Sequence, residues 1–118
     1  MVSFEDFKKL ELVTAKVLEV RDHPNADKLY VLTIDNGDKK ETASGEKNVS
    51  AKREIVAGIK GAYPKEELVG KNIVIIENLE PAVIRGVRSC GMLLAAQDGD
   101  TLSLIVPEKE IKPGSKVR

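Results

Sequence analysis

The chain has 118 residues, of which 42% are hydrophobic; this suits one globular domain over residues 1–118 and excludes a disordered chain. Its 19 lysines and arginines balance 19 aspartates and glutamates, so it lacks the overall positive charge of a protein that coats nucleic acid non-specifically. With one cysteine, Cys90, and one histidine, His23, the chain can form neither an internal disulfide nor the usual zinc sites.

No segment is apolar over about 18 residues, the length that a membrane-spanning helix needs. The N-terminus also lacks the basic stretch and apolar core of a secretory signal. We therefore expect a cytoplasmic protein that is not attached to a membrane, and no motif calls for a cofactor.

Positive charge is concentrated in one segment. Between residues 39 and 60 basic side chains outnumber acidic ones, through Lys39, Lys40, Lys47, Lys52, Arg53 and Lys60. Aromatic residues make up only 3% of the chain, too few for a platform on which single-stranded bases stack. If the chain binds nucleic acid, we expect it to recognise shape and phosphate positions, as a folded RNA permits.

The N-terminal segment predicts a short helix. Ser3 stands at the N-cap position of a capping box, with Asp6 in place of the usual glutamate. Phe4 and Phe7 then lie on one helical face. Two interpretations stay open for these rings: packing on the domain's own barrel, or packing partly on a second subunit.

Alternating and β-branched residues predict a strand over residues 12–21 and another over 29–34. The turn between them, 22–27, contains His23, which is more typical of a turn or packing histidine than of a catalytic one. Asn36-Gly37 predicts a tight hairpin turn. The chain would then return through 39–44 and turn again at 44–49 before a third strand over 53–57.

In the second half, Pro64 begins one helical turn over 64–69 and Gly70 ends it. Strands are predicted over the ranges 72–77, 91–96 and 102–106, with an edge strand at 116–118. About five main strands, with a short helix between the third and fourth, indicate an all-β protein with an OB-fold five-stranded barrel. A β-sandwich is the alternative.

The central stretch, residues 78–96, joins a buried strand at 73–76 to the next apolar strand. It contains Arg85, Arg88 and Ser89 among the turn residues Pro81, Gly86 and Gly91. A loop fixed by strands on both sides is a favourable place for a binding site. From the pattern alone, an ordinary hairpin loop with surface arginines is the favoured interpretation, because two arginines in a loop are a weak signal.

The sequence NLEPAVIRGVRSCGMLLAA resembles the signature of the tRNA-binding domain family. That family includes the C-terminal domain of many methionyl-tRNA synthetases, stand-alone tRNA-binding proteins and the endothelial monocyte-activating polypeptide. The signature residues kept here are Asn78, Leu79, Pro81, Arg85, Gly86, Ser89, Gly91 and Met92. Four further segments resemble the family in order: FEDFKKLEL, HPNADKLYVLTID, REIVAGIKGAYPKEELVGK and PEKEIKPGSKVR.

The resemblance implies an OB-fold homodimer without catalysis of its own, which binds the outer corner of tRNA with little preference among tRNAs. It also implies action beside a methionyl-tRNA synthetase, and the start at Met1 favours a stand-alone chain. Glu80 and Val83 replace family lysines, and Leu12-Val13-Thr14-Ala15 replaces another family segment. The two lost lysines predict weaker binding, because each phosphate contact contributes to affinity.

The resemblance and the charge pattern together predict an RNA-binding set: Lys28, Arg53, Lys60, Asn78, Arg85, Arg88, Ser89 and Met92. The basic members would contact phosphates. For Asn78, Ser89 and Met92 a structural role in the loop or the core is an equal alternative.

Two other functions stay in view. Related OB-fold dimers act as secretion chaperones for unfolded peptides, which would require an apolar groove near the dimer interface. The domain could also serve assembly alone. Catalysis is not expected, because a nucleophile needs a base and an orienting group, and Cys90 has neither nearby in the sequence.

Overall fold

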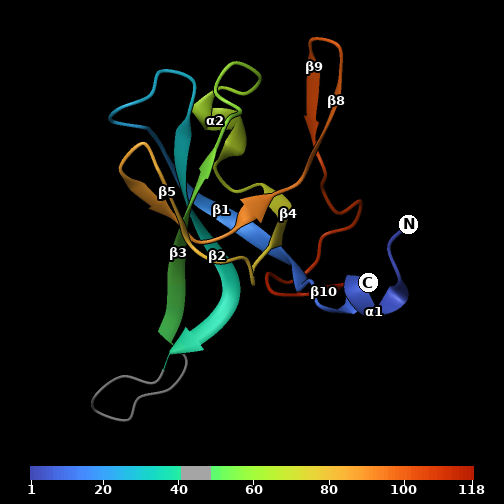
Figure 1. Ribbon diagram of the computed structural model, residues 1–118. Coiled ribbons are helices and arrows are strands. Elements are labelled where there is room, and N and C mark those ends of the chain that lie inside the picture. Colours follow the sequence, from blue (N-terminus) through green and yellow to red (C-terminus); the bar gives the residue numbers. More distant parts are fainter. Residues whose placement is uncertain (41–48) are drawn as a thin grey trace.

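The computed structural model describes residues 1–40 and 49–118, which form a curled antiparallel sheet with two short helices (Figure 1). The sheet runs in the order β3-β2-β1-β4-β7, and β10 adds to β1. The elements are α1 Phe4–Lys8, β1 Leu12–Asp22, β2 Tyr30–Lys40, β3 Val49–Ala57, α2 Lys65–Leu68, β4 Asn72–Ile76, β5 Ala82–Ile84, β6 Val87–Ser89, β7 Met92–Leu93, β8 Ala95–Asp98, β9 Thr101–Leu104 and β10 Lys116–Val117.

Strand β1 is the centre of the sheet. Its first half pairs with β4, from Leu12 opposite Ile76 to Lys16 opposite Asn72. Its second half pairs with β2, and a bulge between Val17 and Glu19 bends the strand. The change of partner along one strand curls the sheet into a half-barrel around the core.

The two edges of the curled sheet meet where β3 passes the segment after β6. The Cys90 N–H donates to the Glu54 carbonyl at 2.9 Å, and the Val56 N–H donates to the Ser89 hydroxyl at 2.9 Å. The buried core inside consists of Val13, Ala15, Val17, Tyr30, Leu32, Ile34, Ile55, Ala57, Ile59, Leu68, Ile73, Ile75 and Leu104. The predicted OB-type architecture, with its two helices, is confirmed.

Both short helices lie where the sequence predicts them. Ser3 caps α1 by accepting a hydrogen bond from the Asp6 N–H at 3.1 Å, and no residue of α1 is buried. Helix α2 lies between β3 and β4, follows Pro64, and is closed by Gly70 at φ +87°. In the described part of the chain, no helix is long and apolar enough to cross a membrane.

The predicted hairpin turn at Asn36-Gly37 is wrong. Strand β2 continues through it, with an irregularity in its pairing with β3 between Asp35 and Lys39. The C-terminal tail crosses here so closely that a Cβ on Gly37 would lie 2.8 Å from the Gly114 Cα. The Asn-Gly pair therefore bends a strand around a crossing chain. The predicted turn at 44–49 lies almost wholly outside the described residues.

The C-terminal part divides more finely than predicted. The expected strand over 91–96 is split into β7 and the start of β8, and β8 pairs with β9 in a hairpin that projects from the barrel (Figure 1). The predicted tail strand is present as β10, beside the first residues of β1. The central stretch is itself a hairpin, β5–β6.

Candidate nucleic-acid interface

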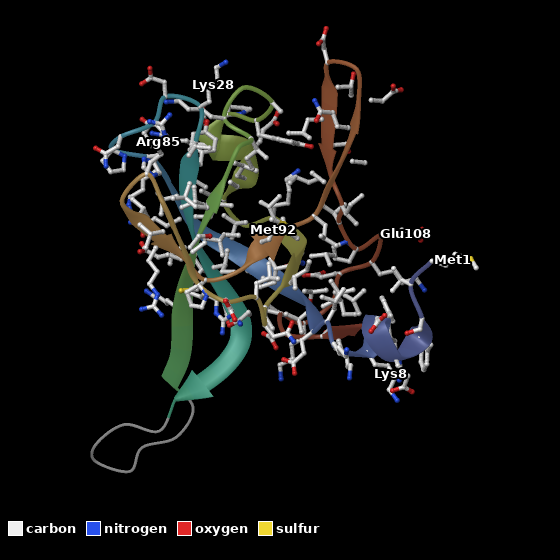
Figure 2. All side chains as sticks on the ribbon, viewed as in Figure 1. Met1, Lys8, Lys28, Arg85, Met92 and Glu108 are labelled. Atoms are coloured by element: carbon white, nitrogen blue, oxygen red, sulfur yellow. The ribbon has the colours of Figure 1, made fainter. Side chains whose placement is uncertain are left out.

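Hairpin β5–β6 presents its two-residue turn, Arg85-Gly86, at one end of the barrel (Figure 2). The closing pair is Ile84 and Val87. Both turn residues have positive φ, 52° for Arg85 and 88° for Gly86, the pattern of a type I′ turn. A non-glycine residue in this left-handed region costs about 1–2 kcal/mol, so Arg85 occupies a strained position.

The turn docks on the loop between β1 and β2. The Asn25 side-chain amide donates to the Arg85 carbonyl at 2.9 Å, and His23 Nε2 lies 2.9 Å from the Ile84 carbonyl. His23 Nδ1 accepts the Asn25 N–H at 3.0 Å. The side chain of His23 is 5% exposed, which confirms the prediction of a packing histidine in the turn.

A shallow groove of about 570 Å³ separates the hairpin turn from this loop. It is lined by Asn25, Ala26, Asp27, Lys28 and Leu29 of the loop and by Ile84 and Arg85 of the hairpin. The structure therefore brings two predicted site residues, Lys28 and Arg85, to one groove. Figure 2 shows both at the upper end of the barrel in that view.

Arg88 lies on the same hairpin, opposite Val83. Val83 is 73% exposed and Arg88 is exposed too. Among the side chains that the structure describes, in residues 1–37 and 52–118, none is a hydrogen-bond or ion-pair partner of the Arg85 or Arg88 guanidinium group. Two free guanidiniums on one short hairpin form a favourable binding surface for phosphate oxygens.

Arg53 is placed differently. Its Nη1 donates to the backbone carbonyls of Glu77, at 2.7 Å, and Cys90, at 3.2 Å. The side chain thereby ties β3 to the end of β4 and to the base of the hairpin. Ser89 is also internal: it is 4% exposed and donates to the Gly91 carbonyl at 3.1 Å. Of the two roles left open for Ser89, its contacts are those of the structural one.

Lys60 forms an ion pair with Asp22 at 3.1 Å, and Lys65 contacts the other oxygen of that carboxylate at 3.0 Å. The hydrogen bonds from Lys65 and Lys60 lower the pKa of Asp22 from its ordinary value of 3.8. Lys60 is therefore partly neutralised by the chain's own carboxylate. Lys65 and Asp22 lie outside the set of site residues predicted from the sequence.

Asn78 and Met92 lie away from the groove. Asn78 Oδ1 accepts the Glu11 N–H at 2.8 Å and its amide donates to the Lys9 carbonyl at 2.6 Å, so it fastens the end of α1 to the barrel. These are the contacts of its structural alternative. Met92 pairs with Ile76 in the sheet and is 55% exposed, so its side chain is not part of the core.

A second groove, of about 310 Å³, is apolar and lies between α1 and β10. It is lined by Phe4, Phe7, Lys8, Leu10, Lys116, Val117 and Arg118. The two rings stack on each other with centroids 6.5 Å apart, yet Phe4 remains 70% exposed. Among the described residues, no cluster of histidine, cysteine, aspartate or glutamate is suited to hold a metal ion.

The sequence model of one protein family, described as "Putative tRNA binding domain", matches residues 12–116. The methionine–tRNA ligase of Pyrococcus horikoshii is 50% identical over 117 residues, 99% of this chain and 14% of that protein. The Thermotoga maritima enzyme is 48% identical over 116 residues, 98% of this chain and 16% of that protein. The chain thus spans about one seventh of the length of the curated relatives it matches.

Solved structures of several proteins share the fold. A MetRS-related protein from Pyrococcus horikoshii is 29% identical with a TM-score of 0.83, covering 100% of this chain and 98% of that one. The CsaA chaperone protein from Picrophilus torridus is 30% identical with a TM-score of 0.82, covering both chains fully at 100%. The C-terminal domain of Plasmodium vivax p43 is 30% identical with a TM-score of 0.80, covering 96% of this chain and 62% of that one.

Proposed function

Because the chain belongs to the tRNA-binding domain family, we propose that it binds folded tRNA through hairpin β5–β6 and the groove beside it. The observation that carries this proposal is the set of exposed cations around the hairpin turn. Arg85 of the hairpin turn and Lys28 of the β1–β2 loop both line the groove, and Arg88 is exposed on strand β6 of the same hairpin. Such an arrangement suits a polyanion held at several phosphates.

We propose recognition of the tRNA by its shape, at the outer corner of the L, with little preference among tRNA species. Arg85 and Arg88 grip phosphates, and Lys28 adds a third cation across the groove. Val83 and Met92 offer exposed apolar contacts to an unstacked base. Three predicted residues act indirectly, through hydrogen bonds to backbone groups of the barrel: Arg53, Asn78 and Ser89. Lys60 contributes less positive charge than Arg85, because it is paired with Asp22.

The test is a salt titration of tRNA binding, with a single-stranded RNA of equal length as competitor. We expect preference for the folded tRNA, and a loss of about tenfold or more in affinity for the double variant Arg85→Ala, Arg88→Ala, together with a shallower salt slope. The charge-matched control is Lys109→Ala, Lys112→Ala on the C-terminal tail. Equal binding of both RNAs, unchanged by the arginine variant, would contradict the assignment.

We propose that two copies of the chain associate through the α1–β10 groove. Phe4, Phe7 and Leu10 are all exposed there, although large apolar side chains on one face are ordinarily covered. The double variant Phe4→Ser, Phe7→Ser should weaken self-association by about a hundredfold, measured by sedimentation equilibrium. An unchanged dimer, or a parent chain that is monomeric at all concentrations, contradicts this interface.

A second candidate function is peptide binding by the same apolar groove. It is favoured by the full-length likeness to the CsaA chaperone protein, together with the exposed phenylalanines. An unfolded, apolar peptide labelled with a fluorophore separates the two ideas. If the peptide competes with self-association and the Phe4→Ser, Phe7→Ser variant loses both peptide and dimer, the peptide uses the dimer face. Binding of tRNA without binding of the peptide supports the first proposal.

The methionine–tRNA ligase relatives suggest a working context. We propose that the domain supports a methionyl-tRNA synthetase by holding tRNA, without catalysis of its own. Addition of this chain to a synthetase catalytic domain should lower the KM for tRNA and leave kcat for amino-acid activation unchanged. A change in activation without tRNA would contradict a role limited to tRNA binding.

A further inference from the structure

Hairpin β5–β6 is too short to fix its own turn. Each strand has three residues, and an isolated two-stranded hairpin is marginal in water. The turn also keeps Arg85 at a φ of 52°, which non-glycine residues adopt rarely. Contacts from outside the hairpin must therefore hold Arg85 in its conformation.

Those contacts come from His23 and Asn25, 60 or more residues earlier in the chain. His23 Nε2 bonds the Ile84 carbonyl, which belongs to the peptide plane before Arg85. Asn25 Nδ2 donates to the Arg85 carbonyl, which belongs to the peptide plane after it. With both planes fixed, the direction of the Arg85 Cα–Cβ bond is fixed as well.

The hydrogen bonds also assign the tautomer of His23. The Asn25 N–H donates to Nδ1, so Nδ1 carries a lone pair and the ring proton is on Nε2. That proton is donated to the Ile84 carbonyl. His23 is 5% exposed, so neither bond competes freely with water.

We propose that His23 and Asn25 are positioning residues, which aim the Arg85 side chain at an RNA phosphate opposite Lys28. This inference rests on the proposed tRNA binding and explains how Arg85, the main cation of that site, is oriented. If the Arg85 backbone were mobile in the free protein, RNA binding would carry the entropic cost of ordering it. The two hydrogen bonds already order this backbone before RNA binds, so part of that cost is absent from the binding step. Asn25 also joins the loop to the hairpin at the groove, because it lines the groove and donates to the Arg85 carbonyl.

Asn25→Ala is the first variant, because Asn25 is exposed and its loss leaves the core intact. We expect tRNA affinity to fall about three- to tenfold. In an Arg85→Ala background the same change should alter affinity by less than about twofold, because Asn25 acts through Arg85. Gln97→Ala, which removes an exposed amide from β8, is the matched control and should bind tRNA as the parent does.

The histidine has two informative replacements. In His23→Asn the new amide keeps an acceptor near the Nδ1 position and loses the donor to the Ile84 carbonyl. In His23→Gln the amide nitrogen reaches the Nε2 position and keeps that donor. We expect His23→Gln to retain more tRNA affinity than His23→Asn, and ¹⁵N spectra of the parent to show a protonated Nε2 and an unprotonated Nδ1.

Amide hydrogen exchange gives a readout that needs no RNA. Residues 84–87 should exchange faster in Asn25→Ala than in the parent, while β1 and β4 stay protected. Full protection of the turn in Asn25→Ala, or equal losses of affinity in the presence and absence of Arg85, overturns the positioning role. A parent that fails to prefer folded tRNA, with its turn loosened by Asn25→Ala as expected, overturns the proposed function instead.

Discussion

Two grooves among the described residues differ in their chemistry and in how they are built. The groove at the β5–β6 turn is lined by Lys28 and Arg85 and is built from tight turns whose backbone is held by side chains. The groove between α1 and β10 is built from the two terminal segments, and its exposed rings, Phe4 and Phe7, lie among the basic residues Lys8, Lys116 and Arg118. A rigid, cationic surface suits an RNA of fixed shape, whereas exposed rings on terminal elements suit a protein partner.

The two grooves depend on different internal contacts, so each can be damaged separately. The tail that carries β10 is held where Gly114 crosses Gly37, whereas the hairpin is held by Ser89 at its base and by Asn25 at its turn. A variant at one set of contacts should therefore affect one partner and spare the other. The following changes test that independence, in order of decreasing effect.

The largest effect is expected for Gly37→Ala. The new Cβ would lie 2.8 Å from both the Gly114 Cα and the Pro113 carbonyl oxygen, at a φ of +80°. Strain and overpacking together should lower the free energy of unfolding by about 3 kcal/mol, measured by urea denaturation. Because the displaced tail carries β10, self-association should weaken more than tRNA binding.

Gly61→Ala is the control for this change. A Cβ at Gly61 would meet no atom within 4 Å, so its stability should stay within about 0.5 kcal/mol of the parent. If Gly37→Ala and Gly61→Ala unfold at the same urea concentration, the crossing of β2 and the tail is not the constraint described above.

Ser89→Ala is the intermediate case and acts on the other groove. The Ser89 hydroxyl accepts from the Val56 N–H and donates to the Gly91 carbonyl, and it is buried. Its removal leaves a backbone N–H without a partner, so the free energy of unfolding should fall by about 1–3 kcal/mol. Ser103→Ala, whose hydroxyl has only a long contact of 3.5 Å, should cost less than about 0.5 kcal/mol.

The same variant separates the two roles of Ser89. If Ser89 has only a structural role, folded Ser89→Ala protein should show a modest decrease in tRNA affinity, because the base of the hairpin is less firmly held. A variant with parental stability and a large loss of tRNA affinity would instead mean that the hydroxyl contacts the RNA directly. Dimerisation should be unchanged in either case, since the α1–β10 groove does not involve Ser89.

Local signals predicted most of the elements that form both grooves. Ser3 caps α1, Gly70 closes α2, and β-branched residues form β1 and β4, because each of these effects acts within a few residues. The hairpin turn predicted at Asn36-Gly37 is wrong because a distant part of the chain determines the conformation there. The turn preference of this pair is overruled by a tail that crosses more than 70 positions later in the chain.

The candidate site was harder to predict, since arginines look alike in a sequence. Arg53 and Arg85 differ because the carbonyls of Glu77 and Cys90, 24 and 37 positions from Arg53, lie within reach of its guanidinium. The hydrogen bond from Asn25 to the Arg85 carbonyl joins residues 60 positions apart, so no local sequence motif predicts it. Only the folded arrangement of the strands distinguishes a cation that holds the barrel from one that is free to bind phosphate.

The smallest effect is expected for Asp22→Asn, which removes the negative charge that pairs with Lys60 and Lys65. Asp22 binds both Lys60 and Lys65, and these two hydrogen bonds lower its pKa below 3.8. A lowered pKa in the folded state means that the carboxylate stabilises the fold above the unfolded pKa, and that this contribution disappears as the pH falls through the folded value. The stability difference between parent and Asp22→Asn should therefore be constant near neutral pH and shrink below about pH 3.8.

The same substitution frees two lysines, so tRNA binding should become slightly tighter and its salt slope slightly steeper at pH 7. Self-association through the apolar groove should not change. Asp100→Asn, in the exposed turn between β8 and β9, changes the net charge equally and is the control. Should both variants tighten tRNA binding equally, the gain comes from net charge alone. A gain limited to Asp22→Asn extends the cationic surface from Lys28 and Arg85 to Lys60 and Lys65.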